Sequence, residues 1–472
     1  MSDPIAPLEE NDLPTREKSF WKMTGPGAVM VGLAIGSGEL VLWPWITAKF
    51  GAGMAWAAVL GIFMQMWINF EIGRWTLATG ESAFTGFARV SRNFIILFIV
   101  MLFILAWLPG WARATGVSLR YLIYGLEGKG ADWQWAILVY LCIFAILFGP
   151  KRIYTTIERI ISVMVLVIVF GMIVVAIQIG SPADIADMGR GLVNIGYTKF
   201  DEEFDFLRFF GAMVFVGAGG FGQLYYAYYI REKGIGMGAR IPELTSALRN
   251  KDATQSQFGF VYRDNDDNAR RFRDWFSFVK QDNILYFFLL NTFITLLFMF
   301  GALVVLHAEG IVPSEADIIW DLSQILQSTM GVFGHYLFLV IAVCAMFSSQ
   351  LAISDGGYRI WTDMLRTNFK FPRKFTVGQV YLCLAVTLAS IGVFSIWFFE
   401  TRDVLVLDFF FINAAINGAG MAIWVPLVLY MNIKFLPKSA RPHLINIIMV
   451  SLASLFYLSF ALYIVWDKIS SL

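Results

Sequence analysis

Apolar runs long enough to cross a membrane recur along the whole chain and leave little room for any other fold. The hydrocarbon core of a bilayer needs about 20 mostly apolar residues in helical form. Windows of this length occur near residues 26–48, 54–77, 94–116, 133–149, 154–180, 206–230, 281–307, 333–361, 375–398, 404–432 and 443–466. With 58% hydrophobic residues, the chain is also more apolar than a typical soluble domain. The sequence therefore predicts an all-α polytopic membrane protein with about eleven transmembrane helices, here called spans one to eleven.

The charged residues between the spans indicate how the chain is oriented. Loops that follow even-numbered spans, together with the N-terminal tail 1–25, hold most of the Lys and Arg, whereas segment 308–321 holds four acidic residues and no Lys or Arg. Positively charged loops favour the cytoplasmic side. We therefore expect a cell-membrane protein with a cytoplasmic N-terminus and an extracytoplasmic C-terminus. The long loop 231–280 is expected to lie along the cytoplasmic membrane face, with a regulatory or partner-docking element as the alternative.

Glycine clusters interrupt two of the spans. Span one contains GLAIGSGEL from Gly32, and span six contains FVGAGGFGQL from Phe215. Because the two clusters lie five spans apart, they occupy matching places in two five-helix repeats of opposite orientation. The predicted units are a first repeat at 26–180, a second repeat at 206–432 and an additional helix within 433–472. Paired interruptions of this kind are typical of an inverted-repeat secondary transporter with its substrate site near the bilayer midplane.

The candidate site is built around these interruptions, where both helices are expected to lose helicity halfway through the membrane. Freed N–H groups can hold an anion and freed C=O groups a cation. Span ten adds two asparagines, four residues apart on one helix face. The expected substrate-binding residues are Gly36, Ser37, Gly38, Glu39, Gly217, Ala218, Gly219, Gly220, Gln223, Asn413 and Asn417. Two alternatives remain open: the glycines serve only close helix packing, and the asparagines bond only to neighbouring helices.

Several segments together give the chain a resemblance to a known family. GPGAVMVGLAIGSGE in span one, RWTLATG after span two and QLYYAYYIR after the span-six cluster are similar to corresponding segments of the Nramp family of divalent-metal transporters. The similarity runs over most of the chain. It implies a LeuT-type fold with five-plus-five inverted repeats and an additional helix. It also implies a transport function and no enzymatic activity.

The chain departs from the family at the residues that bind metal. The family's Asp-Pro-Gly-Asn in the first helix corresponds to Gly36, Ser37, Gly38 and Glu39, and its Met-Pro-His in the sixth corresponds to the segment from Gly220. Without a methionine sulfur, a soft transition metal such as Mn2+ is disfavoured and a hard, partly hydrated cation such as Mg2+ is favoured. The ligands expected by this resemblance are Glu39, Ser37 and Gln223, and no resident cofactor is expected.

A second departure concerns the third span, where an acidic residue of the family is replaced by Arg113 within Ala-Arg-Ala-Thr-Gly. Arginine does not titrate in proteins, so we expect no proton coupling of the family type. Arg113 is expected to pair with Glu39, with snorkelling to the headgroups as the alternative. A pair would neutralise the site and favour an amino acid, another zwitterion or a small anion, because Gly-Ser-Gly also resembles the carboxylate-binding motif of amino-acid transporters of this fold.

Other functional classes find little support in the sequence. It contains no nucleophile with a base, no phosphate-binding loop and no cluster of carboxylates and histidines within the spans, which disfavours an enzyme or a channel. The expected partners are the lipid bilayer and a transported small solute or ion, and not nucleic acid. A chain that carries both repeats is expected to work as a monomer.

Overall fold

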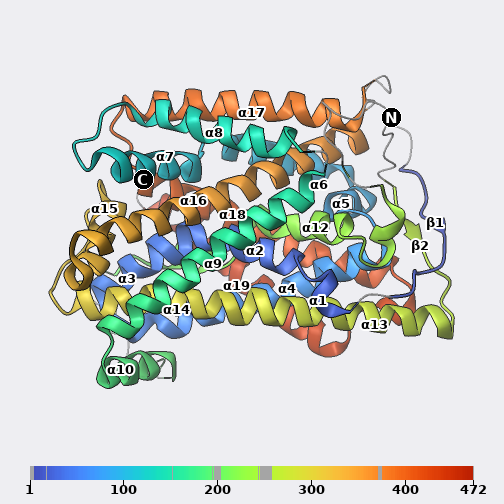
Figure 1. Ribbon diagram of the computed structural model, residues 1–472. Helices are drawn as coiled ribbons and strands as arrows, with labels where there is room; N and C mark the ends of the chain where they lie inside the picture. The colour runs from blue at the N-terminus through green and yellow to red at the C-terminus, as the bar shows by residue number, and fades with distance from the viewer. Residues whose placement is uncertain are drawn as a thin grey trace.

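The computed structural model describes residues 5–16, 19–150, 152–193, 195, 204–242, 244, 258–369 and 375–470. Its long helices run side by side along one common direction (Figure 1). The only strands within the described residues are β1 (Glu9–Glu10) and β2 (Phe260–Val261), which pair in parallel. The molecule is therefore a helical bundle, as the apolar runs predict.

The first half of the chain supplies the helices of spans one to five. Span one comprises α2 (Pro26–Ala34), η1 (Ile35–Leu42) and α3 (Trp43–Phe50), and span two comprises η2 (Gly51–Met54) and α4 (Ala55–Thr79). Span three is divided into α6 (Arg92–Ala106) and α7 (Gly110–Tyr124), and α8 (Asp132–Phe148) and α9 (Ile153–Ile179) follow. Short helices α1 (Phe20–Met23), α5 (Ala83–Val90) and α10 (Pro182–Val193) flank them.

The second half begins with span six, formed by α11 (Phe206–Phe215), η4 (Gly220–Leu224) and α12 (Tyr225–Glu232). Span seven comprises α13 (Asp266–Asp282), η6 (Asn283–Leu290), α14 (Asn291–Gly301) and η7 (Ala302–His307). The remaining long helices are α16 (Gln324–Asn368), α17 (Val377–Glu400), α18 (Val406–Phe435) and α19 (Leu444–Ser470). Short connecting helices are η5 (Gly236–Arg240), α15 (Ile318–Leu322) and η8 (Lys438–Ala440).

Each of the eleven predicted apolar ranges coincides with helical structure. Within the described residues, nine helical segments are long and apolar enough to cross a membrane. One of them, Pro26–Thr79, contains both span one and span two, and Asp132–Phe148 is an apolar helix slightly below that length. The prediction of an all-helical polytopic fold is confirmed.

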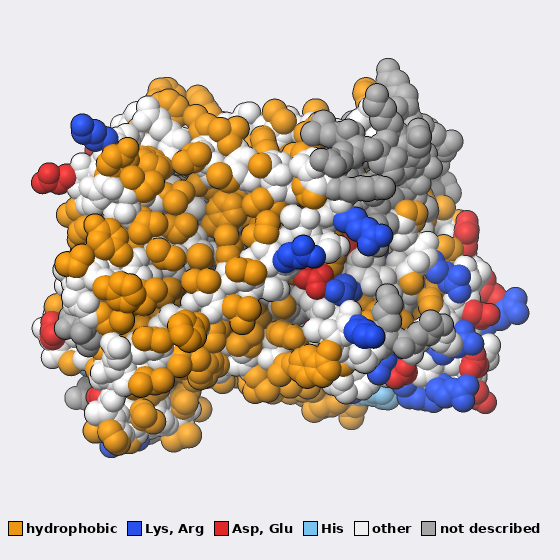
Figure 2. All heavy atoms as spheres, in the orientation of Figure 1, with side chains coloured by type: hydrophobic (Ala, Val, Ile, Leu, Met, Phe, Trp, Pro, Cys, Tyr) orange, Lys and Arg blue, Asp and Glu red, His pale blue; other side chains and the backbone are white. Residues whose placement is uncertain are grey.

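Exposed apolar side chains cover most of the bundle surface in the view of Figure 2, whereas Lys, Arg, Asp and Glu gather at one end. On α9 and α19, large side chains such as Phe170 (72% exposed) and Ile177 (77%) point away from the protein. A lipid environment would cover such surfaces without cost, since acyl chains are as apolar as they are. The charged end holds β1, β2 and the start of α13 (Figure 1).

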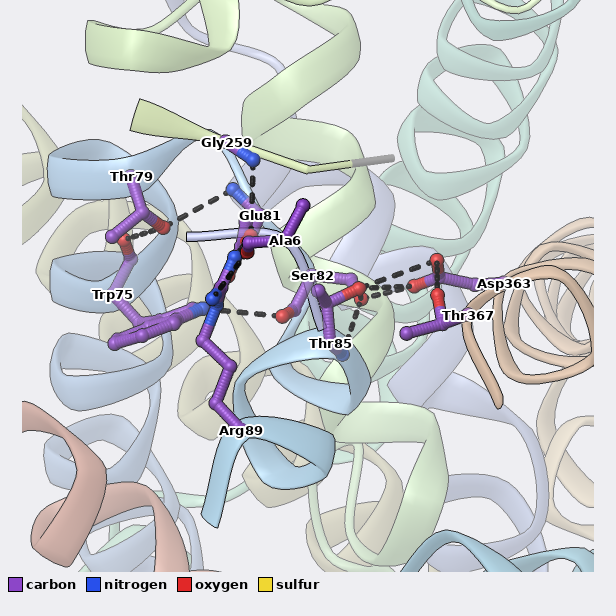
Figure 3. A network of polar contacts seen from close by, with 10 residues as sticks. All are labelled: Ala6, Trp75, Thr79, Glu81, Ser82, Thr85, Arg89, Gly259, Asp363 and Thr367. Atoms are coloured by element: carbon purple, nitrogen blue, oxygen red, sulfur yellow. Dashed lines mark hydrogen bonds and ion pairs between the residues drawn. The ribbon is translucent and has the colours of Figure 1, made fainter. Parts of the chain in front are cut away.

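A network of polar contacts connects several elements at this charged end (Figure 3). The buried Glu81 carboxylate accepts from Arg89 Nη2 at 2.5 Å and from the Gly259 N–H at 3.0 Å, next to the strand pair. The buried Asp363 accepts from Tyr228 Oη at 2.9 Å and from Ser82 Oγ. These contacts join α5, α12 and α16 to the segment that precedes β2.

Candidate functional site

Span six loses its helical conformation where the sequence predicts it. Helix α11 ends at Phe215, and the next helical turn, η4, begins at Gly220. Within this interval Gly217 has φ +96°, and Gly220 has φ +82°. Residues other than glycine rarely adopt these backbone angles, so glycine is required at both positions. The predicted break in span six is confirmed.

Span one does not break, and this prediction is wrong. Residues Ile35–Leu42 form a π-helix that continues directly from α2 and into α3. A π-helical segment widens the helix but keeps its backbone largely hydrogen-bonded. Hydroxyl groups of α16 cover the carbonyls at its start: Ser348 Oγ donates to Gly32 O at 2.9 Å, and Ser349 Oγ donates to Leu33 O at 2.8 Å. The segment therefore needs no solute to satisfy its backbone.

The glycines of span one allow close helix packing instead. A Cβ atom on Gly38 would lie 2.1 Å from the Phe215 carbonyl oxygen at the end of α11. A Cβ atom on Gly36 would lie 2.5 Å from Ser349 Oγ and 2.7 Å from Trp111 Nε1. All three distances are shorter than real Cβ atoms essentially ever show. For these two residues the packing interpretation holds, and it brings span one against the break in span six.

Glu39 is completely buried and binds the broken segment directly. Its Oε1 accepts from the Gly217 N–H at 2.6 Å and from Asn291 Nδ2 at 3.2 Å. Its Oε2 accepts no hydrogen bond from the described residues. The carboxylate thus satisfies an N–H group that the break has released.

Arg113 does not pair with Glu39, contrary to the sequence-based expectation. Its Nε donates to Asp132 Oδ2 at 2.8 Å, and its Nη1 donates to the Val404 carbonyl at 2.6 Å. The reason is that span three is divided after Ala106, so that Arg113 lies in the separate helix α7 and meets the first residue of α8. No Lys or Arg side chain of the described residues forms an ion pair with the Glu39 carboxylate.

Side chains from two other spans bind further backbone groups at the break. In α4, Gln65 Nε2 donates to the carbonyls of Val214 (3.0 Å) and Val216 (2.8 Å). In α18, Asn417 Oδ1 accepts from the Phe221 N–H at 2.9 Å, and Met421 Sδ accepts from the Gly220 N–H at 3.0 Å. The released N–H groups of Gly217, Gly220 and Phe221 are therefore all bound by protein acceptors.

The two asparagines of span ten bond to backbone groups and also line the central cavity, and their binding of a substrate stays a prediction. Asn413 Nδ2 donates to the carbonyls of Leu108 and Phe409, both at 2.8 Å, and Asn417 Nδ2 donates to Asn413 O at 2.9 Å. Both side chains also line the central cavity. Gln223 does not line it, because its Nε2 reaches back to the Gln65 carbonyl at 2.6 Å.

A cavity of about 150 Å3 lies beside the break. It receives Ser37 from span one, Gly217 to Gly219 from span six, and Asn413 with Asn417 from span ten. Of the other predicted site residues, Gly36, Gly38, Glu39, Gly220, Gln223 and Arg113 are not part of its wall. The wall contains no Asp, Glu, Lys, Arg, His, Cys or Met, and its remaining members are polar or apolar neutral groups. Six of them are Trp111, Phe221, Tyr225, Gln350, Ser354 and Tyr358.

Sequence reasoning missed two residues that shape the site, Gln65 and Asn291. Each is an amide inside an apolar span, and buried amides in a membrane need partners. That signal is visible in the sequence. Which backbone groups they serve depends on the path of span six. Within the described residues, no group of three or more His, Cys, Asp or Glu side chains could hold a metal ion.

Comparison with known proteins identifies the family. The sequence profile described as "Nramp: Natural resistance-associated macrophage protein-like" matches residues 34–467. The chain belongs to the Nramp family. It is thus a multi-pass membrane protein and a secondary transporter rather than an enzyme. None of the curated proteins matches it significantly.

Solved structures show the same fold at low sequence identity. A mutant of the manganese transporter of Eremococcus coleocola matches with a TM-score of 0.67 and 14% identity, over 98% of this chain and 90% of that one. Mhp1, a nucleobase-cation-symport-1 family transporter with bromovinylhydantoin bound, matches with a TM-score of 0.57 and 13% identity, over 98% and 93%. MhsT in complex with L-phenylalanine matches with a TM-score of 0.51 and 14% identity, over 95% and 99%. This Nramp-family chain therefore has a LeuT-type fold.

Proposed function

We propose that this Nramp-family transporter carries a hard divalent cation, with Mg2+ favoured over Mn2+, and that the ion keeps part of its hydration shell in the central cavity. The proposal includes transport without the proton coupling typical of the family. It rests on which backbone groups of the span-six break remain available to a solute.

The supporting observation is an excess of acceptors at the cavity wall. The released N–H groups of Gly217, Gly220 and Phe221 are bound by Glu39, Met421 and Asn417. Gly217 and Ala218 lie between α11 and η4, and both are part of the cavity wall. Their carbonyls can coordinate a cation.

A buried carboxylate next to the cavity wall has the sign that a cation requires. Glu39 accepts a hydrogen bond from the N–H group of Gly217, and Gly217 is part of the cavity wall. Arg113 pairs with Asp132 instead of Glu39. Ser37, Asn413 and Asn417 contribute hydroxyl and amide groups to the same wall. Oxygen ligands of this kind suit Mg2+ with several retained waters better than a softer metal. The Met421 sulfur is bound to the Gly220 N–H and is not part of the wall.

A small organic solute such as an amino acid or another zwitterion is the second candidate. The observation that favours it is the aromatic share of the wall, which includes Trp111, Tyr225 and Tyr358. Neutral amides and aromatic rings are the usual lining of sites for small organic molecules. Against it stands the lack of a Lys or Arg side chain for a carboxylate among the described residues of the wall.

Binding calorimetry on the purified full-length protein distinguishes the two candidates. The titrants are Mg2+, Mn2+ and a panel of amino acids. We expect Mg2+ to bind and Glu39→Gln to weaken this binding by about tenfold or more, because the variant keeps the side-chain shape but loses the charge. Glu309→Gln makes the same change at an exposed carboxylate and should leave Mg2+ binding unchanged.

Two outcomes would contradict the proposal. One is heat from amino acids with none from Mg2+, which would assign the cavity to an organic solute. The other is Mg2+ binding that is equally strong in Glu39→Gln and Glu309→Gln, which would remove the role given to the buried charge.

Orientation and assembly are part of the proposal. We place the charged end of the bundle, with β1, β2 and the start of α13, on the cytoplasmic side, in agreement with the distribution of Lys and Arg in the loops (Figure 2). A single chain supplies every residue of the cavity wall, so we propose that the transporter works as a monomer. Protease accessibility in sealed vesicles and mass measurement in detergent test these two points.

A further inference from the structure

Three buried side chains form a polar group on the side of the span-six break that does not face the cavity. Glu39 comes from η1, Gln65 from α4 and Asn291 from α14. All three are 0% exposed, and none is part of the cavity wall. The group is therefore separate from the proposed path of the substrate.

These side chains converge on one residue of the break. Glu39 Oε1 lies 2.6 Å from the Gly217 nitrogen and 3.2 Å from Asn291 Nδ2. Gln65 Oε1 lies 2.7 Å from the position that a Cβ atom on Gly217 would occupy. Glu39 and Gln65 thus lie against Gly217 from two helical elements, and Asn291 joins them from a third through the Glu39 carboxylate.

The hydrogen-bond pattern fixes which ends of the amides point inward. Gln65 Nε2 is held by two backbone carbonyls, those of Val214 and Val216, and Asn291 Nδ2 is held by the Glu39 carboxylate. Turning either amide around would place an oxygen against another oxygen. The orientation is therefore determined, although amide nitrogens and oxygens look alike.

As a result, the group has more acceptors than donors. Glu39 Oε2, Gln65 Oε1 and Asn291 Oδ1 accept no hydrogen bond from the described residues. Gln223 Oε1 also accepts no hydrogen bond from the described residues, and the Nε2 atom of the same side chain donates to the Gln65 carbonyl. Buried oxygens without a donor are costly, and more so in a membrane protein.

We propose that a hard monovalent cation of the Na+ class binds between Glu39, Gln65 and Asn291. The oxygens are the ligands that hard cations prefer, and one carboxylate balances one positive charge. A divalent ion would leave a net charge buried. A proton on Glu39 would supply one O–H donor and could satisfy only one of the amide oxygens.

Such an ion would act on the substrate site through Gly217. This residue bonds to Glu39 on one side and is part of the cavity wall on the other. Occupation of the group would therefore fix the position of the break beside the cavity. The inference goes beyond the proposed function, because this ion lies outside the cavity whatever the cavity carries.

Thermal unfolding of the purified full-length protein tests the proposal. Unfolding is followed without divalent ions in NaCl and in N-methyl-D-glucamine chloride at equal ionic strength. We expect Na+ to raise the Tm of the wild type saturably by roughly 2 °C or more, because it binds only the folded state. Asn291→Ala removes one oxygen and should raise the Na+ concentration for half of this effect about tenfold.

Asn413→Ala is the matched control, because Asn413 is also a buried amide of a span but lines the cavity. It should keep the Na+ response of the wild type, since the cavity and the polar group are separate. Loss of Mg2+ binding with an intact Na+ response would refute the proposed function alone.

The proposal is wrong if wild-type protein responds equally to Na+ and to N-methyl-D-glucamine. It is also wrong if Asn291→Ala retains the full Na+ response. Stabilisation that follows pH but not Na+ would assign the group to a proton. The comparison of salts on wild-type protein decides the matter even where Asn291→Ala does not fold.

Discussion

Span one continues as a helix through Ile35–Leu42, whereas span six leaves the helical conformation between Phe215 and Gly220, although both segments are rich in glycine. The glycines of the two spans serve different purposes. Gly36 and Gly38 leave room for close contact between neighbouring segments because they have no side chain. Gly217 and Gly220 adopt backbone angles that other residues avoid. A glycine cluster in a membrane helix therefore does not by itself indicate a break.

The two uses depend on each other in this protein. Because Gly38 lets span one approach the end of α11, the Glu39 carboxylate next to it reaches the Gly217 N–H that the break releases. Gln65 serves the carbonyls on the same segment. The continuous span one thus supplies a hydrogen-bond acceptor to the broken span six. Variants in each span can test these separate roles.

The largest effect is expected from Gly38→Ala in the continuous span. The new methyl group would lie 2.1 Å from the Phe215 carbonyl oxygen, so two backbones would have to separate. We expect a loss of about 3 kcal/mol in the free energy of unfolding, the upper end for overpacking, together with loss of transport. Unfolding in detergent and uptake into proteoliposomes measure the two effects.

Gly189→Ala in α10 is its control, because an added Cβ there meets nothing within 4 Å. It should be neutral or should stabilise the protein by about 0.5 kcal/mol, as alanine favours an exposed helix over glycine. Equal stability of the two variants would show that span one does not need close contact with span six.

Gln65→Leu should have the next largest effect and tests the broken span. The leucine has a similar volume but cannot donate to the Val214 and Val216 carbonyls, which would remain buried without that donor. We expect a loss of about 2 kcal/mol. The exposed Gln281→Leu on α13 is the matched control in chemical denaturation. A break that retains its stability without Gln65 would contradict the role given to this side chain.

Ser349→Ala should cost less, about 1 kcal/mol, because it removes one hydroxyl donor from a span that keeps its helical hydrogen bonds. Leu33 O loses its partner, whereas Gly32 O is still bound by Ser348. Ser390→Ala, whose hydroxyl bonds only within its own exposed helix at Val386, serves as the control for unfolding measurements. A larger loss of unfolding free energy in Ser349→Ala than in Gln65→Leu would contradict the expectation that span one depends less on side-chain hydrogen bonds than span six.

The sequence predicted the architecture well because membrane helices have a strong local signal. All eleven apolar ranges are helical, and the glycines at Gly217 and Gly220 correctly placed the break in span six. The predicted break in span one was wrong, because the hydroxyls of Ser348 and Ser349 belong to a helix more than 300 residues away in the chain. Glycine content cannot reveal such partners.

The predicted charge pair failed for a similar reason. Arg113 was expected to face Glu39, but its partner Asp132 lies 19 residues further along the chain, at the start of the next helix. Recognising this pair requires knowledge that span three is divided before α7. The roles of Gln65 and Asn291 could not be predicted either, because the groups that they bind belong to distant segments of the chain.

Gly222→Ala is expected to have the smallest effect, and it sharpens the comparison within span six itself. An added Cβ would lie 3.4 Å from Leu33 Cδ2 and 3.8 Å from Tyr225 Cε2, which are ordinary contacts, and no positive φ is involved. We expect a change within about 0.5 kcal/mol. Gly220→Ala, two residues earlier, combines φ +82° with a Cβ position 2.1 Å from Asn417 Oδ1, and should be clearly less stable in the same unfolding assay. Equal stability of these two variants would mean that backbone angle and space at Gly220 do not determine where the helix breaks.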